Sequence, residues 1–100
     1  MSSKTVLTIT VREIEGTCPV YEPGDSLEII EGFKLRSGIT LCMHSIASIL
    51  PYYIPLSRGT RPKELGLGNE DKAYVQCLDP CDYTGGGTVT FEITRSELDN

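Results

Sequence analysis

Residues 41–58, LCMHSIASILPYYIPLSR, hold the helical pattern that makes this chain α+β rather than all β. Apolar side chains recur here at the spacing of one helix face, at Cys42, Ile46, Ile49 and Tyr53. Thr40 is a suitable N-cap and Gly59 a suitable C-cap. Pro51 removes a backbone donor inside this stretch, so the helix either kinks there or ends near Leu50, with a second turn running on towards Gly59. Of these, we expect one kinked helix.

On both sides of this helix, the chain alternates between apolar and polar residues with the period of a half-buried strand. The alternating segments are residues 5–12, 26–31, 73–78 and 88–95. Phe33 and Leu35 continue one face of the second segment beyond Gly32. We therefore expect a single α+β domain over residues 1–100, in the order strand, strand, helix, strand, strand. The strands would form a four-stranded, mostly antiparallel sheet under one kinked helix. The alternative is a partly closed barrel.

The charge of the chain argues against two classes of partner. The chain has 100 residues, a net charge of −5, and only nine Lys and Arg residues. The densest basic group is Arg58, Arg61 and Lys63, all within one connection. Phosphate backbones and anionic lipid surfaces are bound by clustered basic residues. We therefore expect no nucleic acid and no membrane among the partners.

The start of the chain predicts the cellular compartment. Residues 1–4 lead directly into the first alternating segment, without the apolar region of a signal peptide. The longest apolar stretch, residues 46–56, is interrupted by Ser48, Pro51 and Pro55, so no membrane span is expected. These features predict a cytoplasmic protein, in which cysteines are more often ligands, redox thiols or core residues than disulfides.

The four cysteines are the main candidates for chemistry. Cys18 lies in a predicted loop, Cys42 at the start of the helix, Cys77 at the end of a strand, and Cys81 in the loop that follows. Four thiolates can hold zinc or an iron–sulfur cluster, and a histidine such as His44 can replace one ligand at zinc. The favoured hypothesis is a small protein that binds such a metal centre through these four cysteines, with His44 as a reserve ligand.

Two other functions remain open at this point, and no catalytic residue or enzyme activity is assigned. The first is a protein-interaction module or homodimer, in which the cysteines are structural and exposed strand edges with Tyr52 and Tyr53 form the interface. The second is a thiol redox protein. In that case Cys42, near a helix N-terminus that lowers a thiol pKa, would attack, and Cys18 or Cys81 would resolve the product.

Several short motifs resemble the signature of a family of small prokaryotic proteins of similar length. They are GTCPVY at residues 16–21, Gly24-Asp25, Leu41-Cys42, PYY at residues 51–53, Gly59, and Cys77-x-Asp79. The form with CMHS at residues 42–45 and CLDPC at residues 77–81 resembles the archaeal, methanogen-type branch. No activity, cofactor or partner is established for this family. The resemblance implies a cytoplasmic prokaryotic protein and adds weight to Cys18, Cys42 and Cys77.

Overall fold

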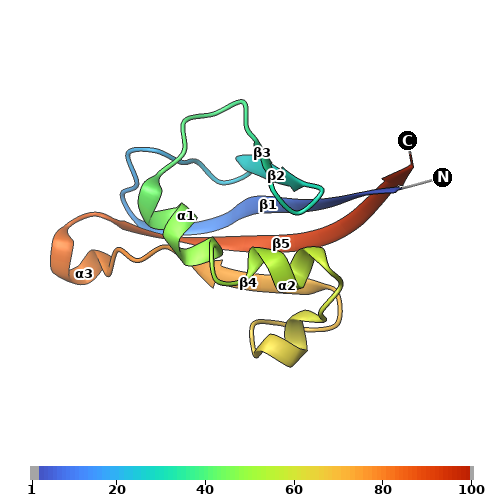
Figure 1. Ribbon diagram of the computed structural model, residues 1–100. Coiled ribbons are helices and arrows are strands. Elements are labelled where there is room, and N and C mark those ends of the chain that lie inside the picture. Colours follow the sequence, from blue (N-terminus) through green and yellow to red (C-terminus); the bar gives the residue numbers. More distant parts are fainter. Residues whose placement is uncertain (1–2, 100) are drawn as a thin grey trace.

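The computed structural model describes residues 3–99, which form one antiparallel sheet with short helical segments (Figure 1). The strands are β1 (Ser3–Gly16), β2 (Ser26–Ile30), β3 (Lys34–Arg36), β4 (Lys72–Gln76) and β5 (Gly87–Asp99). The helices are α1 (Met43–Ile49), α2 (Tyr53–Ser57) and α3 (Cys81–Thr84), and Pro62–Leu65 forms the short 3₁₀ helix η1.

The sheet is built around the long ribbon of β1 and β5. The strand order is β3-β2-β1-β5-β4, and every neighbouring pair is antiparallel. β1 and β5 pair from Ser3–Asp99 to Gly16–Gly87, with an irregularity between Val11 and Glu13. The two ends of the described chain therefore lie side by side, while α3 lies at the far end of the ribbon (Figure 1).

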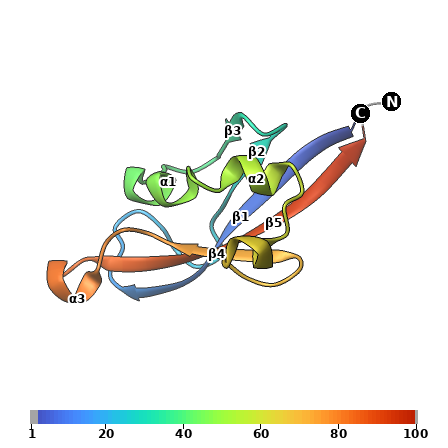
Figure 2. The same cartoon turned by 60° about the horizontal axis from the view of Figure 1, so that its bottom comes forward.

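One face of the sheet forms the core. Alternating residues of β1, β2, β4 and β5 are buried there, as the sequence predicted: Leu7, Ile9, Val11, Leu27, Ile29, Ala73, Val75, Val89, Phe91 and Ile93. The helices α1 and α2 cover this face and bury Ile49 and Leu56 against it (Figure 2). The opposite face carries partly exposed threonines, such as Thr8, paired with Thr94.

The expected four-stranded sheet with one kinked helix is wrong. The described residues contain five strands and three short helices, and the partly closed barrel is also wrong because β3 and β4 are separate edges. The fifth strand arises at Glu31 and Gly32, which have φ of 58° and 80° and turn the chain back on itself. Leu35 therefore lies beside Ile29 on a new strand instead of extending the face of β2.

The predicted kinked helix is two helices. Leu50 N–H still donates to the Ile46 carbonyl at 3.0 Å, but Pro51 has no N–H with which to continue this ladder. The chain leaves α1 at this point and begins α2 at Tyr53. A third helix, α3, occupies part of the predicted loop over residues 79–87, and Gly85 ends it with a φ of 74°.

Candidate functional site

Cys77 is part of the core. Only 8% of its surface is exposed, and its side chain lies on the inner face beside Val89. The Val89 N–H donates to the Cys77 Sγ at 3.3 Å, and the Cys77 Sγ lies 3.5 Å from the Gly87 carbonyl oxygen. This thiol therefore has backbone partners on β5 that fix its position.

Cys18 and Cys42 lie at the rim of the core, and both are linked to Tyr21. The Tyr21 N–H donates to the Cys18 Sγ at 3.4 Å, and the Cys42 N–H donates to the Tyr21 hydroxyl at 2.9 Å. The same buried hydroxyl lies 2.7 Å from the Ser45 Oγ. The Tyr21 side chain thus holds the start of α1 against the core, and the Cys42 side chain makes no capping hydrogen bond.

Cys81 and His44 lie in different settings. Cys81 begins α3, where its N–H donates to the Thr88 Oγ1 at 3.3 Å, and its Cβ lies close to Gly16. His44 is exposed on α1. Within residues 3–99, no group of three or more His, Cys, Asp or Glu side chains is arranged to hold a metal ion. Zinc or iron–sulfur binding through Cys18, Cys42, Cys77, Cys81 and His44 therefore stays a prediction.

An apolar groove lies between β2–β3 and the helices α1–α2. Its volume is about 150 Å³, and it is lined by Leu27, Ile29, Phe33, Leu35, Ile46, Ile49, Leu50 and Tyr53. Three of the large side chains that line it are exposed: 70% for Phe33, 52% for Leu35 and 54% for Leu50. Clustered exposure of this kind marks interaction surfaces, whereas single exposed apolar residues are ordinary.

A second hollow of about 380 Å³ adjoins this groove and shares Phe33 and Tyr53 with it. Its wall includes Ser57 and Arg58 at the end of α2. Within the part of the chain that the structure describes, Arg58 is the one Lys or Arg without an ion pair, and the buried Ser57 Oγ has no hydrogen-bond partner. The adjoining hollow therefore presents one exposed basic side chain, Arg58, that has no ion pair among the described residues.

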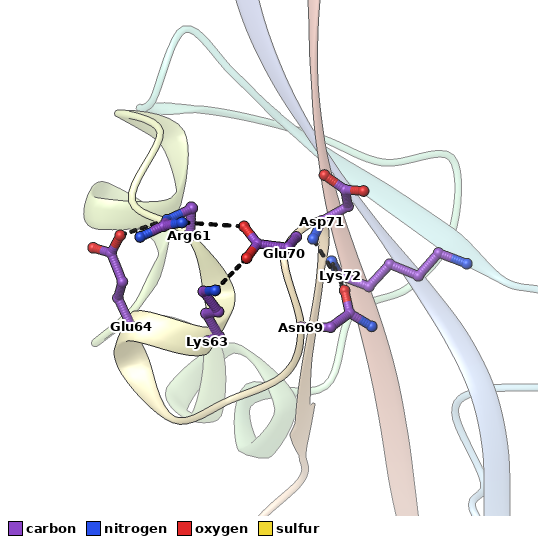
Figure 3. A network of polar contacts seen from close by, with 7 residues as sticks. All are labelled: Arg61, Lys63, Glu64, Asn69, Glu70, Asp71 and Lys72. Atoms are coloured by element: carbon purple, nitrogen blue, oxygen red, sulfur yellow. Dashed lines mark hydrogen bonds and ion pairs between the residues drawn. The ribbon is translucent and has the colours of Figure 1, made fainter.

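The far edge of the sheet carries a network of charges instead (Figure 3). Arg61 pairs with Glu64 at 2.7 Å and with Glu70 at 3.3 Å, and Lys63 also pairs with Glu70. Lys63 and then Arg61 lower the pKa of the Glu70 carboxyl, while the hydrogen bond to Glu64 is the main reason that the Arg61 pKa is raised. These contacts join η1 to the loop that leads into β4.

Sequence reasoning found one wall of the groove and missed the other. Tyr53 was expected at an interface in the interaction-module hypothesis, and it does line the groove. Phe33 and Leu35 were assigned to a continuation of the second strand, which would have placed them beside Leu27 and Ile29. The turn residues Glu31-Gly32 were the available signal that the chain reverses there.

The comparisons with known proteins leave the function to be argued from this geometry. No family model, no curated protein and no solved structure matches the chain. The resemblance to a prokaryotic family therefore stays a prediction. Among the described residues, no helix is long and apolar enough to cross a membrane.

Proposed function

We propose that this protein is a protein-interaction module that binds a partner chain in the groove between β2–β3 and α1–α2. The observation that carries this proposal is that Phe33, Leu35 and Leu50 line one groove and are exposed, with the exposed Ile54 in the adjoining hollow. When a partner covers an exposed apolar side chain, the complex is stabilised by about 25 cal/mol per Å² of apolar surface removed from water.

The position of the cluster supports the same function. The groove runs beside β3, the three-residue edge strand of the sheet, so apolar side chains and an uncovered strand edge occur together. Strand edges and apolar grooves are two of the surfaces that peptide-binding domains use. Cys77, Cys18 and Cys42, in this proposal, fill the core and its rim.

A selection experiment tests this function and does not require the partner to be identified first. A displayed library of random peptides is selected on the full chain, and the enriched peptides are then measured against single variants. Leu35→Asp and Leu50→Asp should each weaken binding at least tenfold, because a carboxylate would have to lose its water on entering the groove.

The matched control for this selection is Leu78→Asp. Leu78 is 62% exposed, similar to Leu50, but it lies beyond the end of β4 and does not line the groove. This variant should bind the selected peptides as the unmodified chain does. Peptides that bind all three variants equally well would disprove the proposal.

The cytoplasmic location stays a prediction, and the metal hypothesis is tested apart from the groove. Metal content of protein purified without oxygen gives the number of bound zinc or iron atoms per chain. A stoichiometric metal that is lost in Cys18→Ser would favour the metal hypothesis, and an unchanged peptide affinity in that variant would separate it from the interaction module.

A further inference from the structure

We propose that the occupant of the groove is an extended segment of a partner protein that adds to β3 as a sixth strand and alternates apolar with acidic side chains. This inference rests on the proposed function and names the chemistry of the partner. Hydrogen bonding at the sheet edge, the side chains of β3 and the shape of the groove each support it.

Backbone hydrogen bonding in the sheet shows which way β2 directs its polar groups. The Glu31 N–H donates to the Thr5 carbonyl at 2.7 Å, so these opposed residues form a hydrogen-bonded pair. In an antiparallel sheet, hydrogen-bonded and non-bonded pairs alternate. Leu7 and Ile29 lie two residues further along and therefore form the next hydrogen-bonded backbone pair. The N–H and C=O groups of Ile29 thus point towards β1.

The same alternation leaves one residue of β3 free. Glu28 and Ile30 direct their backbone groups away from β1, towards Arg36 and Lys34 of β3. Leu35 lies between those two residues, so its N–H and C=O point away from β2. In the described residues no strand lies on that side of β3, and these two groups can receive the backbone of a partner strand.

The side chains of β3 alternate in character as well as in direction. Leu35 faces the groove, while Lys34 and Arg36 lie on the opposite face of the sheet. Opposite charges directly across two strands stabilise their pairing. A partner strand should therefore place apolar side chains beside Leu35 and carboxylates beside Lys34 and Arg36.

The present partners of these basic residues can be exchanged. Lys34 pairs with Glu31 at 3.3 Å and Arg36 with Glu28 at 2.6 Å, and the basic side chains of both pairs are more than half exposed. Exposed ion pairs contribute little stability, so a partner carboxylate can share or replace them at small cost. Arg58, without an ion pair in the described residues, offers a further contact at the end of the groove.

The size of the groove fits alternate side chains better than a continuous apolar face. Its volume of about 150 Å³ is comparable to a cavity that holds one benzene molecule, so it takes about one branched or aromatic side chain.

A second copy of this chain fits poorly, because antiparallel β3 strands centred on Leu35 would place Lys34 opposite Arg36. Like charges at that position oppose pairing.

Labelled peptides of about six residues, a common strand length, test this inference on the full chain by fluorescence anisotropy. The first peptide alternates leucine with glutamate, and the second replaces each glutamate with lysine. A third carries N-methyl groups on the residues whose N–H would face β3. The glutamate peptide should bind roughly tenfold more tightly than each of the other two.

The possible results separate this inference from the proposed function. Equal binding of the lysine peptide, lost in Leu35→Asp, would overturn the acidic partner and keep the groove. Equal binding of the N-methylated peptide would overturn strand addition, as expected if the groove takes a helix. If no designed peptide binds, the inference fails, while the proposed function is still decided by the library selection. If Leu35→Asp binds all of them unchanged, both the inference and the proposed function fail.

Discussion

The two edges of the sheet differ in whether another segment of the chain covers them. At the β4 edge, residues 67–69 lie along the strand: the Tyr74 N–H donates to the Leu67 carbonyl at 2.7 Å, and Gly68 forms a bridge with Ala73. The ion pairs of Arg61, Lys63 and Glu70 hold that segment in place (Figure 3). At the β3 edge, the described chain adds no further strand, and Phe33 and Leu35 are exposed.

This difference separates a structural edge from a binding edge. Uncovered strands are templates for unwanted pairing, and proteins usually cover them, shorten them or place charges on them. The first half of β4 is covered, while β3 is short and charged on one face only. The apolar face of β3 is left beside a groove, which is the arrangement expected of a surface that receives a specific partner.

The largest effect should come from disturbing the covered edge. A Cβ added at Gly68 would lie 1.9 Å from the Lys72 carbonyl oxygen, so Gly68→Ala must push residues 67–69 away from β4. We expect the free energy of unfolding to fall by about 2–3 kcal/mol, measured by urea denaturation. The control is Gly38→Ala, where a Cβ has no neighbour within 4 Å and stability should not fall. Equal unfolding midpoints would show that this segment does not cover the edge.

The next largest loss of stability should come from removing the anchor of α1, the helix that forms one wall of the groove beside β3. Tyr21→Phe removes the hydroxyl that accepts from the Cys42 N–H and contacts the Ser45 Oγ. These groups are buried or partly buried, so the free energy of unfolding should fall by about 1–2 kcal/mol. Tyr74→Phe is the matched control, since its hydroxyl donates to Glu92 at an exposed position. A similar loss in both variants would contradict the anchoring role of Tyr21.

A smaller, pH-dependent effect should come from the charges of the covered edge. The Glu70 pKa is lowered in the folded chain, so its ion pairs stabilise the fold fully above the ordinary glutamate value near 4.5. That contribution is lost as pH falls through the lowered pKa. Glu70→Gln should therefore be less stable than the unmodified chain at neutral pH, and the difference should vanish in acid. Glu22→Gln, at an exposed carboxylate outside these ion pairs, is the control for the loss of one surface charge. A Glu70→Gln difference that persists in acid would contradict this account.

The smallest change in stability should come from the open edge. Leu35 is 52% exposed, so Leu35→Ser should alter the free energy of unfolding by less than about 0.5 kcal/mol. The same variant should lose peptide binding, which separates the function of this residue from folding. A large loss of stability would show that Leu35 belongs to the core.

The sequence predicted the buried faces of the strands because period-2 alternation depends only on local order. Leu7, Ile9 and Val11 were assigned correctly for this reason, as were Val89, Phe91 and Ile93. The reversal at Glu31-Gly32 was missed, because two residues at positive φ turn a continuing strand into a hairpin without changing the apolar pattern. The helix break at Pro51 was expected as a kink.

The candidate site was harder to predict than the strands. The groove joins Leu35 of β3 to Leu50 beyond α1, and sequence spacing does not show which distant segments become neighbours. The cysteines drew attention by their chemistry, but a thiol such as Cys77 on an apolar strand face also packs as a small core residue. Only the three-dimensional arrangement separates these roles.

Hydrogen exchange of the Leu35 amide, with and without the leucine–glutamate peptide, tests the central claim most directly. Because this N–H points to the uncovered edge, saturating peptide should slow its exchange at least tenfold if a strand adds there. The Tyr74 amide, already bonded to Leu67, should not change. A Leu35 amide that exchanges at the same rate in the saturated complex would contradict the account.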